Sequence, residues 1–391
     1  MNHNNPLKIV YLLPGGLFAP GGMERITILK ANYLAEKTGC DVSIVTTEQM
    51  GRPVFFPVSE KVRLYHLNIG IHAGFGKEKY IEKVISRFLK TREYVRELKT
   101  LLNTVRPDIT VSLLGLDIEF LNDFKDGSVK IGELHFPANF RQLMARKLSN
   151  APVPNWVAAV RTQTFRRACR KLSRLVVLTR EEKASWKGAD NIEVIPNAVP
   201  FFPETTADYS EKKAIAAGRL VYEKGFDMLI EAWKAVYEKH PDWELHIYGD
   251  GNEKANLCRL IRQAGLDAAV KIHPPEKDIY ARYPKHSMLL FPSRYLEAFP
   301  MVLLEAMSCG LPVVAFDAPC GPKDIIRDGV NGFLAGTGDI EALSAKINTL
   351  IESEGIRKTM GKAAREMSFD YGEEKIMQRW LQLFEDVKKE R

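Results

Sequence analysis

Two pairs of charged residues in the second half of the chain have the types and spacing of a ligand-binding site. Arg219 and Lys224 follow a short apolar run, and a planar guanidinium with a mobile ammonium suits the clamping of a diphosphate. Glu297 and Glu305 suit hydroxyl groups, because each carboxylate accepts two hydrogen bonds. The two pairs together indicate a ligand with hydroxyl groups at both ends and phosphates between them.

Each pair also has a simpler interpretation. Arg219 and Lys224 are compatible with solvated surface cations that pair with Glu223 and Asp227. Glu305 could equally be a buried residue that pairs with a helix cap. Since a glutamate in an otherwise apolar helix needs a partner when it is buried, we favour the functional interpretation of the glutamates.

The residues around the glutamates predict a helix at about 300–309. Pro300 suits the first turn of this helix, and Gly310 suits its carboxyl cap. Glu297 then precedes the helix, and Glu305 lies roughly 7–8 Å along its axis. The two carboxylates are therefore spread along one ligand and do not form a proton-sharing dyad.

A glycine-rich segment follows the first apolar run of the chain. Gly21 and Gly22 precede an amphipathic stretch at 23–37, so backbone N–H groups and the positive end of a helix can approach an anion. The spacing is not that of the dinucleotide motif G-x-G-x-x-G. A turn that needs positive φ accounts for the glycines equally well.

Short apolar runs alternate with amphipathic stretches along the chain, which predicts an α/β fold of parallel strands and crossover helices. Three prolines within 196–203 exclude a helix or a central strand there and predict a domain boundary. The default site is the cleft between two doubly wound domains. The predicted strands are 8–13, 42–46, 62–67, 109–113, 129–133 and 175–178, then 214–217, 244–247, 270–272, 288–291 and 312–315.

The formal net charge of +7 comes from one segment. Residues 138–174 contain nine Lys and Arg and no acid, whereas the remaining chain has 47 basic and 49 acidic residues. Apolar and aromatic residues interleave with these cations, which favours contact with anionic lipid over a solvated crossover. The residues that we assign to this acceptor or membrane surface are Arg141, Arg146, Lys147, Arg166, Arg167, Arg170 and Lys171.

The composition excludes several classes of protein. With 45% hydrophobic and 27% charged residues, the chain is neither disordered nor fibrous. Five cysteines without a C-x-x-C pair suggest neither a disulfide framework nor a zinc ribbon, and a reducing cytoplasm fits best. No apolar run is long enough to span a bilayer, so any membrane contact is expected to be peripheral. No D-x-D triplet occurs, so we expect no metal and no cofactor.

Six segments, in this order and spacing, resemble the family 4 retaining glycosyltransferases of the GT-B fold. No single segment is decisive, but their order is specific, and the likeness spans nearly the whole chain. The segments are 21–25 (GGMER), 194–199 (VIPNAV), 218–225 (GRLVYEKG), Glu297 with Glu305, 309–315 (CGLPVVA) and 328–332 (DGVNG).

The resemblance implies two Rossmann-like domains that face each other across a cleft. Residues 1–195 would bind the acceptor, 196–370 the nucleotide-sugar, and 371–391 would form a helix that crosses back to the first domain. The implied enzyme is a metal-independent, hexosyltransferase-type enzyme of bacterial surface-polysaccharide synthesis, such as capsule or lipopolysaccharide. It would move a sugar with retention from a nucleotide-diphosphate donor, most simply a UDP-sugar, to a lipid-linked or polysaccharide acceptor. It would work in the cytoplasm, at the inner face of the membrane.

The resemblance also assigns roles to individual residues. Arg219 and Lys224 would hold the diphosphate, Glu305 the ribose and Glu297 the donor sugar. Retention through a short-lived ion pair needs stabilisation of the leaving phosphate more than a protein nucleophile. The residues implied to bind the donor are Gly21, Gly22, Ala298, Phe299, Pro300, Met301, Val302 and Glu305.

Family members often present a histidine at the end of a strand in the first domain. Here His135 follows the predicted strand 129–133, and it would bond a sugar hydroxyl and orient the acceptor. Glu133 is the alternative for the same place.

Two other functions are compatible with parts of the pattern. A phosphorylase or a sugar-nucleotide epimerase would share the diphosphate clamp. A nucleic-acid-binding protein would use the basic segment, but no RNP, helix-turn-helix or zinc signature accompanies it.

Overall fold

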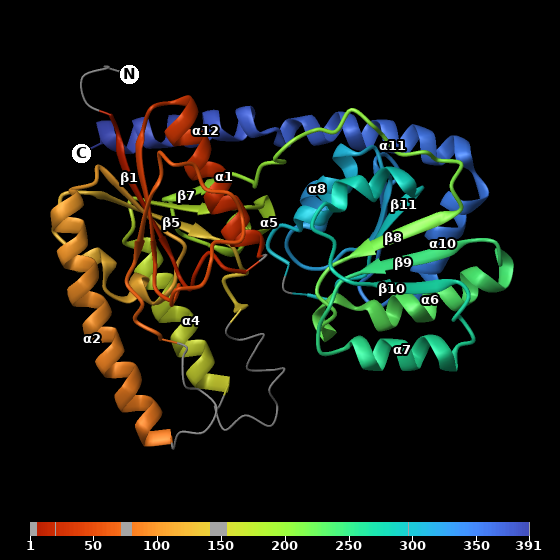
Figure 1. Ribbon diagram of the computed structural model, residues 1–391, viewed down its shortest axis with the longest axis horizontal. Helices are drawn as coiled ribbons and strands as arrows, with labels where there is room; N and C mark the ends of the chain where they lie inside the picture. The colour runs from red at the N-terminus through yellow and green to blue at the C-terminus, as the bar shows by residue number, and fades with distance from the viewer. Residues whose placement is uncertain (1–5, 20, 72–79, 141–154, 296, 391) are drawn as a thin grey trace. The chain divides into compact units, whose positions relative to one another are not determined.

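The computed structural model describes residues 6–19, 21–71, 80–140, 155–295 and 297–390. The chain forms two compact units (Figure 1). Helices α5 (Arg180–Ser185) and α12 (Glu373–Lys389) each begin in the second unit and continue in the first. The first unit comprises Met1–Leu178, Glu182–Ile195 and Ile376–Arg391, and the second comprises Thr179–Glu181 and Pro196–Lys375.

The first unit is built on a seven-stranded parallel sheet in the order β3-β2-β1-β4-β5-β6-β7. Its central strands β1 and β4 are buried along nearly their whole length, as expected for a parallel sheet that helices cover. The strands are β1 (Lys8–Leu13), β2 (Asp41–Thr46), β3 (Arg63–His66), β4 (Ile109–Ser112), β5 (Val129–Leu134), β6 (Arg174–Val177) and β7 (Ile192–Val194). The other helices of this unit are α1 (Gly22–Lys37), α2 (Tyr80–Val105) and α4 (Asn155–Arg170).

The second unit is built on a six-stranded parallel sheet in the order β10-β9-β8-β11-β12-β13. One core joins this sheet to α6, α7 and α10, and Trp233 is completely buried in it. The strands are β8 (Lys213–Ala217), β9 (Glu244–Tyr248), β10 (Val270–His273), β11 (Met288–Phe291), β12 (Val313–Phe316) and β13 (Gly332–Ala335). The helices are α6 (Phe226–Lys239), α7 (Lys254–Gln263), α8 (Met301–Ser308), α9 (Pro322–Ile325), α10 (Ile340–Glu352) and α11 (Glu354–Ser368).

The predicted α/β class is confirmed, and each predicted strand matches an observed one to within one or two residues. The sequence did not predict β7 and β13. Both are edge strands, and they are only three and four residues long. Such short segments lack the continuous apolar run that identifies a central parallel strand.

In each sheet the strand order reverses once, between β1 and β4 in the first unit and between β8 and β11 in the second. The loops that leave two neighbouring strands at such a point diverge and leave a crevice at the carboxyl ends of the strands, where open α/β sheets bind ligands. We therefore expect a ligand site among the residues that follow these four strands.

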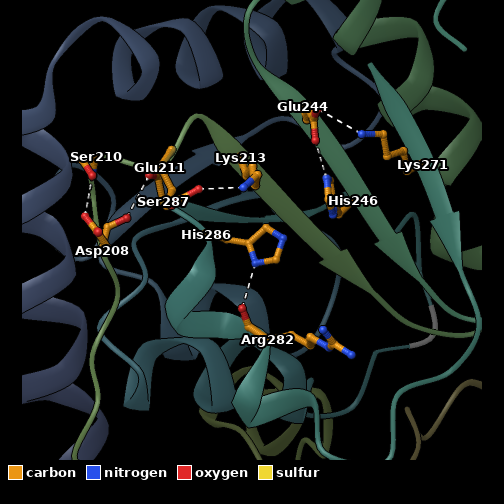
Figure 2. A network of polar contacts seen from close by, with 10 residues as sticks. All are labelled: Asp208, Ser210, Glu211, Lys213, Glu244, His246, Lys271, Arg282, His286 and Ser287. Carbon is orange, nitrogen blue, oxygen red and sulfur yellow. Dashed lines mark hydrogen bonds and ion pairs between the residues drawn. The ribbon is translucent and has the colours of Figure 1, made fainter. Parts of the chain in front are cut away.

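A polar network occupies one face of the second sheet (Figure 2). Glu244 contacts both His246, at 2.8 Å, and Lys271, at 3.0 Å. The His286 ring lies 5.2 Å from that of His246, and its Nδ1 lies 2.8 Å from the carbonyl oxygen of Arg282. Burial lowers the pKa of His286 to about 4, so this imidazole is neutral near pH 7 and Nδ1 donates to the carbonyl.

We predict that His286 makes the stability of the second unit depend on pH. Its pKa is lower in the folded than in the unfolded chain, so its contribution is complete above about pH 6.5 and is lost as the pH falls towards 4. The loss amounts to about 3 kcal/mol. His286→Asn keeps a donor for the Arg282 carbonyl and should flatten this step in urea unfolding followed by tryptophan fluorescence.

His240→Asn is the matched control, since His240 lies at the end of α6 with 21% of its side chain exposed. This control should retain the wild-type pH dependence. Parallel pH profiles for the wild type and His286→Asn would contradict the prediction.

Candidate functional site

The strand reversal in the second unit brings the predicted charged residues together. β8 and β11 are neighbours in the sheet. Arg219 and Lys224 lie in the loop after β8, and Glu297 lies in the loop after β11. Residues that are more than 70 positions apart in sequence therefore share one edge of the sheet.

Lys224 and Glu297 form an ion pair at this edge. The ammonium Nζ of Lys224 lies 2.6 Å from Oε1 of Glu297, and the hydroxyl of Ser293 donates to the same oxygen at 2.6 Å. Glu297 is buried, with 6% of its surface exposed. Two donors thus hold a buried carboxylate in one orientation. Ser293 was not predicted, because nothing in the sequence shows that it reaches the carboxylate.

Gly225 allows the two loops to approach. Its φ is +67°, and a Cβ atom there would lie 2.1 Å from the carbonyl oxygen of Pro292. Any side chain at this position would push the loop after β8 away from the end of β11. The final glycine of the G-R-L-x-x-x-K-G segment is therefore needed to bring Lys224 to Glu297.

One of the two acidic neighbours in the simpler interpretation, Asp227, is engaged elsewhere. Asp227 forms a bidentate ion pair with Arg294, whose guanidinium also lies 4.2 Å from the ring of Tyr222. Arg219 is exposed at the end of β8. A cation is thus left facing solvent at the carboxyl edge of the sheet, where an anionic ligand can reach it.

Helix α8 begins at Met301 and ends at Ser308, so the predicted helix is confirmed to within a residue at each end. Glu305 lies inside it, with 7% of its surface exposed, and the Tyr283 hydroxyl donates to its Oε2 at 3.3 Å. Burial raises the pKa of Tyr283 well above its ordinary value, and Glu305 adds to this effect. Tyr283 is a further residue that the sequence analysis missed.

The loop before α8 is shaped by close packing. Phe299 is buried and lies 5.8 Å from the ring of Tyr371, whereas Ala298, Met301 and Val302 are partly exposed. Gly321 has a φ of +120°, and a Cβ there would lie 2.5 Å from Cδ of Pro300. No side chain caps the start of α8, so its first N–H groups are available to a ligand.

In the first unit, Gly21 and Gly22 have different roles at the start of α1. A Cβ at Gly21 would lie 2.0 Å from the Glu24 carboxylate, so this position must be a glycine for Glu24 to fold back. A Cβ at Gly22 would meet nothing within 4 Å. Neither residue has positive φ, so the interpretation as a positive-φ turn does not apply to them.

His135 follows β5, and its Nε2 lies 3.0 Å from Oε1 of Glu133. The other carboxylate oxygen of Glu133 is paired with Lys30 of α1, and 1% of Glu133 is exposed. Both oxygens of Glu133 are thus engaged within the protein. Of the two alternatives, His135 is the one with a polar atom left for a ligand.

The structure changes the interpretation of the basic segment. Arg166 donates to the carbonyl of Ser185 at 3.1 Å, and Arg170 donates to that of Lys187 at 2.9 Å. These two guanidinium groups therefore hold α4 against the end of α5 and are not simply a lipid-facing surface. Arg167 and Lys171 are exposed, while Arg141, Arg146 and Lys147 lie outside the described residues.

Among the described residues, none of the helices is both long and apolar enough to span a membrane. The His, Cys, Asp and Glu side chains in the same ranges include no cluster of three or more that would suit a metal ion.

The fold is shared by solved structures of low sequence identity. Sucrose-phosphate synthase from Thermosynechococcus elongatus matches 98% of this chain with all of its own, at a TM-score of 0.81 and 18% identity. TarM from S. aureus, solved with fondaparinux, alpha-GlcNAc-glycerol and UDP, matches 97% of this chain at a TM-score of 0.76 and 18% identity. These likenesses support the GT-B fold.

Two proteins match the chain over nearly the full length of both partners. A glycosyltransferase of Haemophilus influenzae, itself uncharacterized, is 32% identical over 92% of this chain and 95% of its own. The amylovoran biosynthesis glycosyltransferase AmsD of Erwinia amylovora is 30% identical over 94% of this chain and 97% of its own. The family model "Glycosyl transferases group 1" matches residues 201–367. The chain therefore belongs to the group 1 glycosyltransferases.

Proposed function

We propose that this glycosyltransferase moves a sugar, with retention of configuration, from a UDP-sugar to a lipid-linked or polysaccharide acceptor in the synthesis of a cell-surface glycan. The observation that carries the proposal is the buried Glu297, held by Lys224 and Ser293 beside the uncapped start of α8. A similarity to an amylovoran biosynthesis enzyme supports the polysaccharide acceptor. UDP in the TarM structure supports the nucleotide.

In this proposal the second unit binds the donor. Arg219 and Lys224 neutralise the diphosphate, and the first N–H groups of α8, with Met301 and Val302, add the positive end of a helix. Glu305, oriented by Tyr283, accepts hydrogen bonds from the ribose. Glu297 and the loop of Ala298, Phe299 and Pro300 bind the donor sugar.

The first unit supplies the remaining groups. Gly21 and Gly22 offer backbone N–H groups to the phosphates, and His135 bonds a hydroxyl of the sugar and orients the acceptor. Departure of the diphosphate develops negative charge, which the two cations stabilise without a protein nucleophile. Retention then follows from attack of the acceptor on the face that the diphosphate leaves, and no metal is needed.

The first prediction from this proposal concerns donor binding. At 100 times its dissociation constant, a UDP-sugar should stabilise the wild-type chain by about 2.7 kcal/mol, seen as a thermal shift. Arg219→Met and Lys224→Met each remove a charge-assisted bond worth about 1.5–3 kcal/mol, so the donor should bind roughly tenfold to a hundredfold more weakly.

Each variant is compared with its own ligand-free melting temperature, since Lys224→Met also leaves Glu297 without its cation. Lys234→Met, on the exposed side of α6, is the matched control and should keep the wild-type shift. A panel of UDP-glucose, UDP-galactose, UDP-N-acetylglucosamine, GDP-mannose and ADP-glucose tests the choice of nucleotide. Equal shifts for Arg219→Met and the wild type would refute the clamp.

The second prediction concerns the reaction. With a bound UDP-sugar and undecaprenyl-diphosphate-linked N-acetylglucosamine as acceptor probe, the chain should release UDP and form an α-linkage from an α-linked donor. Turnover should persist in EDTA, because the phosphate charge is met by Arg219 and Lys224. Formation of an epimer would contradict sugar transfer, and an inverted product would contradict retention. Activity that EDTA abolishes and Mg²⁺ restores would contradict independence of metal.

The third prediction concerns peripheral membrane contact by the first unit. Along α4, Trp156, Val160 and Arg167 lie within about 40° of one another around the helix axis, and the first two are 68% and 56% exposed. Each cation near an anionic membrane contributes about 1 kcal/mol. Arg167 and the next exposed cation along this side, Lys171, are therefore the groups to change. Arg167→Glu with Lys171→Glu should lower flotation with vesicles of equal parts phosphatidylglycerol and phosphatidylcholine.

Trp156→Ala should have a smaller effect in the same direction, because it removes the apolar part of the contact. Lys234→Glu with Lys239→Glu on α6 changes the net charge by the same amount and should leave flotation intact. If both double variants float alike, α4 is not the membrane-facing element.

A further inference from the structure

Lys30 is buried in the first unit, although its side chain carries a charge. It lies on α1 with 2% of its surface exposed, and its ammonium contacts Oε2 of Glu133 on β5. The ammonium also lies 4.4 Å from the ring of Trp380 and 5.4 Å from that of Tyr11. Helix α12 therefore contributes a side chain, that of Trp380, to the surroundings of this ion pair.

Stability alone does not account for the pair. Removing two charges from water costs several kcal/mol for each ion, and apolar residues of similar volume often serve a core equally well or better. A buried lysine in the middle of α1 and a buried glutamate near the carboxyl end of β5 therefore call for a role in addition to packing. The contact of Glu133 with His135 suggests such a role.

Glu133 connects the ion pair to His135. The two residues are two positions apart at the carboxyl end of β5, so they lie on the same face of the strand. Oε1 of Glu133 lies 3.0 Å from Nε2 of His135, while Oε2 is taken by Lys30. The carboxylate is thus shared between a fixed cation inside the protein and the imidazole at its edge.

Glu133 acts only as an acceptor in this arrangement. Burial alone would raise the pKa of its carboxyl group, but Lys30 and His135 together lower it to about 2. The group is therefore a carboxylate throughout the working range of an enzyme. Because a carboxylate accepts hydrogen bonds and donates none, a bond across the 3.0 Å contact requires the hydrogen to be on Nε2 of His135.

A second carboxylate, on α1, interacts electrostatically with the same imidazole. Glu24, in the first turn of α1, has a pKa that burial raises, and the charge interaction with His135 partly offsets this rise. Glu24 folds back against Gly21, beside the glycine pair. His135 therefore interacts with carboxylates from both β5 and α1.

We propose that Glu133 and Lys30 are positioning residues: the carboxylate holds His135 in the tautomer with hydrogen on Nε2, and Nδ1 accepts a hydrogen bond from a hydroxyl of the donor sugar. Lys30 keeps the carboxylate charged and stationary, and Trp380 and Tyr11 keep water from the pair. The second half of this proposal rests on the proposed role of His135 in sugar binding; the first half concerns the protein alone.

The test of the first half is NMR of the full chain labelled with ¹⁵N-histidine. His135→Asn identifies the His135 signals among those of the eight histidines. The wild type should show the form with hydrogen on Nε2. In Glu133→Gln the amide can donate to Nε2, so the signals should move towards the form with hydrogen on Nδ1. An unchanged tautomer in Glu133→Gln, or the opposite tautomer in the wild type, overturns the proposal.

Two further variants guard against effects of misfolding. Lys30→Met with Glu133→Gln replaces the pair by neutral groups of similar shape, which buried sites often accept without loss of stability. It should show the same shift of tautomer as Glu133→Gln, with an unchanged melting profile. Thr46→Val breaks the 2.7 Å contact of Thr46 with Nδ1 of His66 in the same unit and should leave the His135 signals in place.

Kinetics test the second half. Glu133→Gln should lower kcat roughly tenfold to a hundredfold, as loss of an orienting partner does elsewhere, with the donor KM little changed. In a His135→Ala background the same substitution should have no further effect, because the two residues act as a unit. Additive losses overturn the positioning role.

The outcomes separate this inference from the proposed function. If the wild-type chain releases no UDP from any donor, the proposed function fails, and the NMR result still decides whether Glu133 sets the tautomer. If the chain is active and His135→Ala turns over like the wild type, the contact between Nδ1 and the sugar is overturned while glycosyl transfer stands.

Discussion

Parallel strands impose one constraint on which both units depend: the carboxyl ends of neighbouring strands lie side by side, so polar groups that follow them come together from distant parts of the sequence. In the second unit, the adjacency of β8 and β11 makes Lys224 and Glu297 partners. In the first unit, β1 leads into the glycine pair, and β5 ends beside His135. The apolar strands thus determine which polar residues can cooperate.

Each unit contains a lysine–glutamate ion pair whose carboxylate is buried. Lys30 and Glu133 are both removed from water, whereas in the other pair Glu297 is buried and Lys224 keeps 21% of its side chain exposed. A buried charge is costly unless it is paired and hydrogen-bonded. In both pairs a third polar group completes the arrangement: Ser293 in the second unit and His135 in the first. These contacts hold each carboxylate in one orientation. Glu297 then presents its second oxygen to a ligand in one geometry, and Glu133 does the same for the imidazole of His135.

The sequence predicted the parts of the fold and site that depend on local pattern. Continuous apolar runs revealed the central strands, Pro300 bounded α8, and a cation pair after β8 revealed Arg219 and Lys224. It did not reveal Tyr283 or Lys30, whose partners lie 22 and 103 positions away. No periodicity reports such contacts, because they arise only when the strand order is known.

A count of charged residues is limited in the same way, because it does not show which cations bond within the fold. The acid-free segment 138–174 suggested one basic surface, but Arg166 and Arg170 bond to carbonyls at residues 185 and 187. A guanidinium that holds α4 in place cannot also leave the protein for a lipid headgroup without loosening the helix. Any lipid contact by α4 must therefore use its exposed side, with the helix still folded against the unit, and an exposed cation such as Arg167 is available for it.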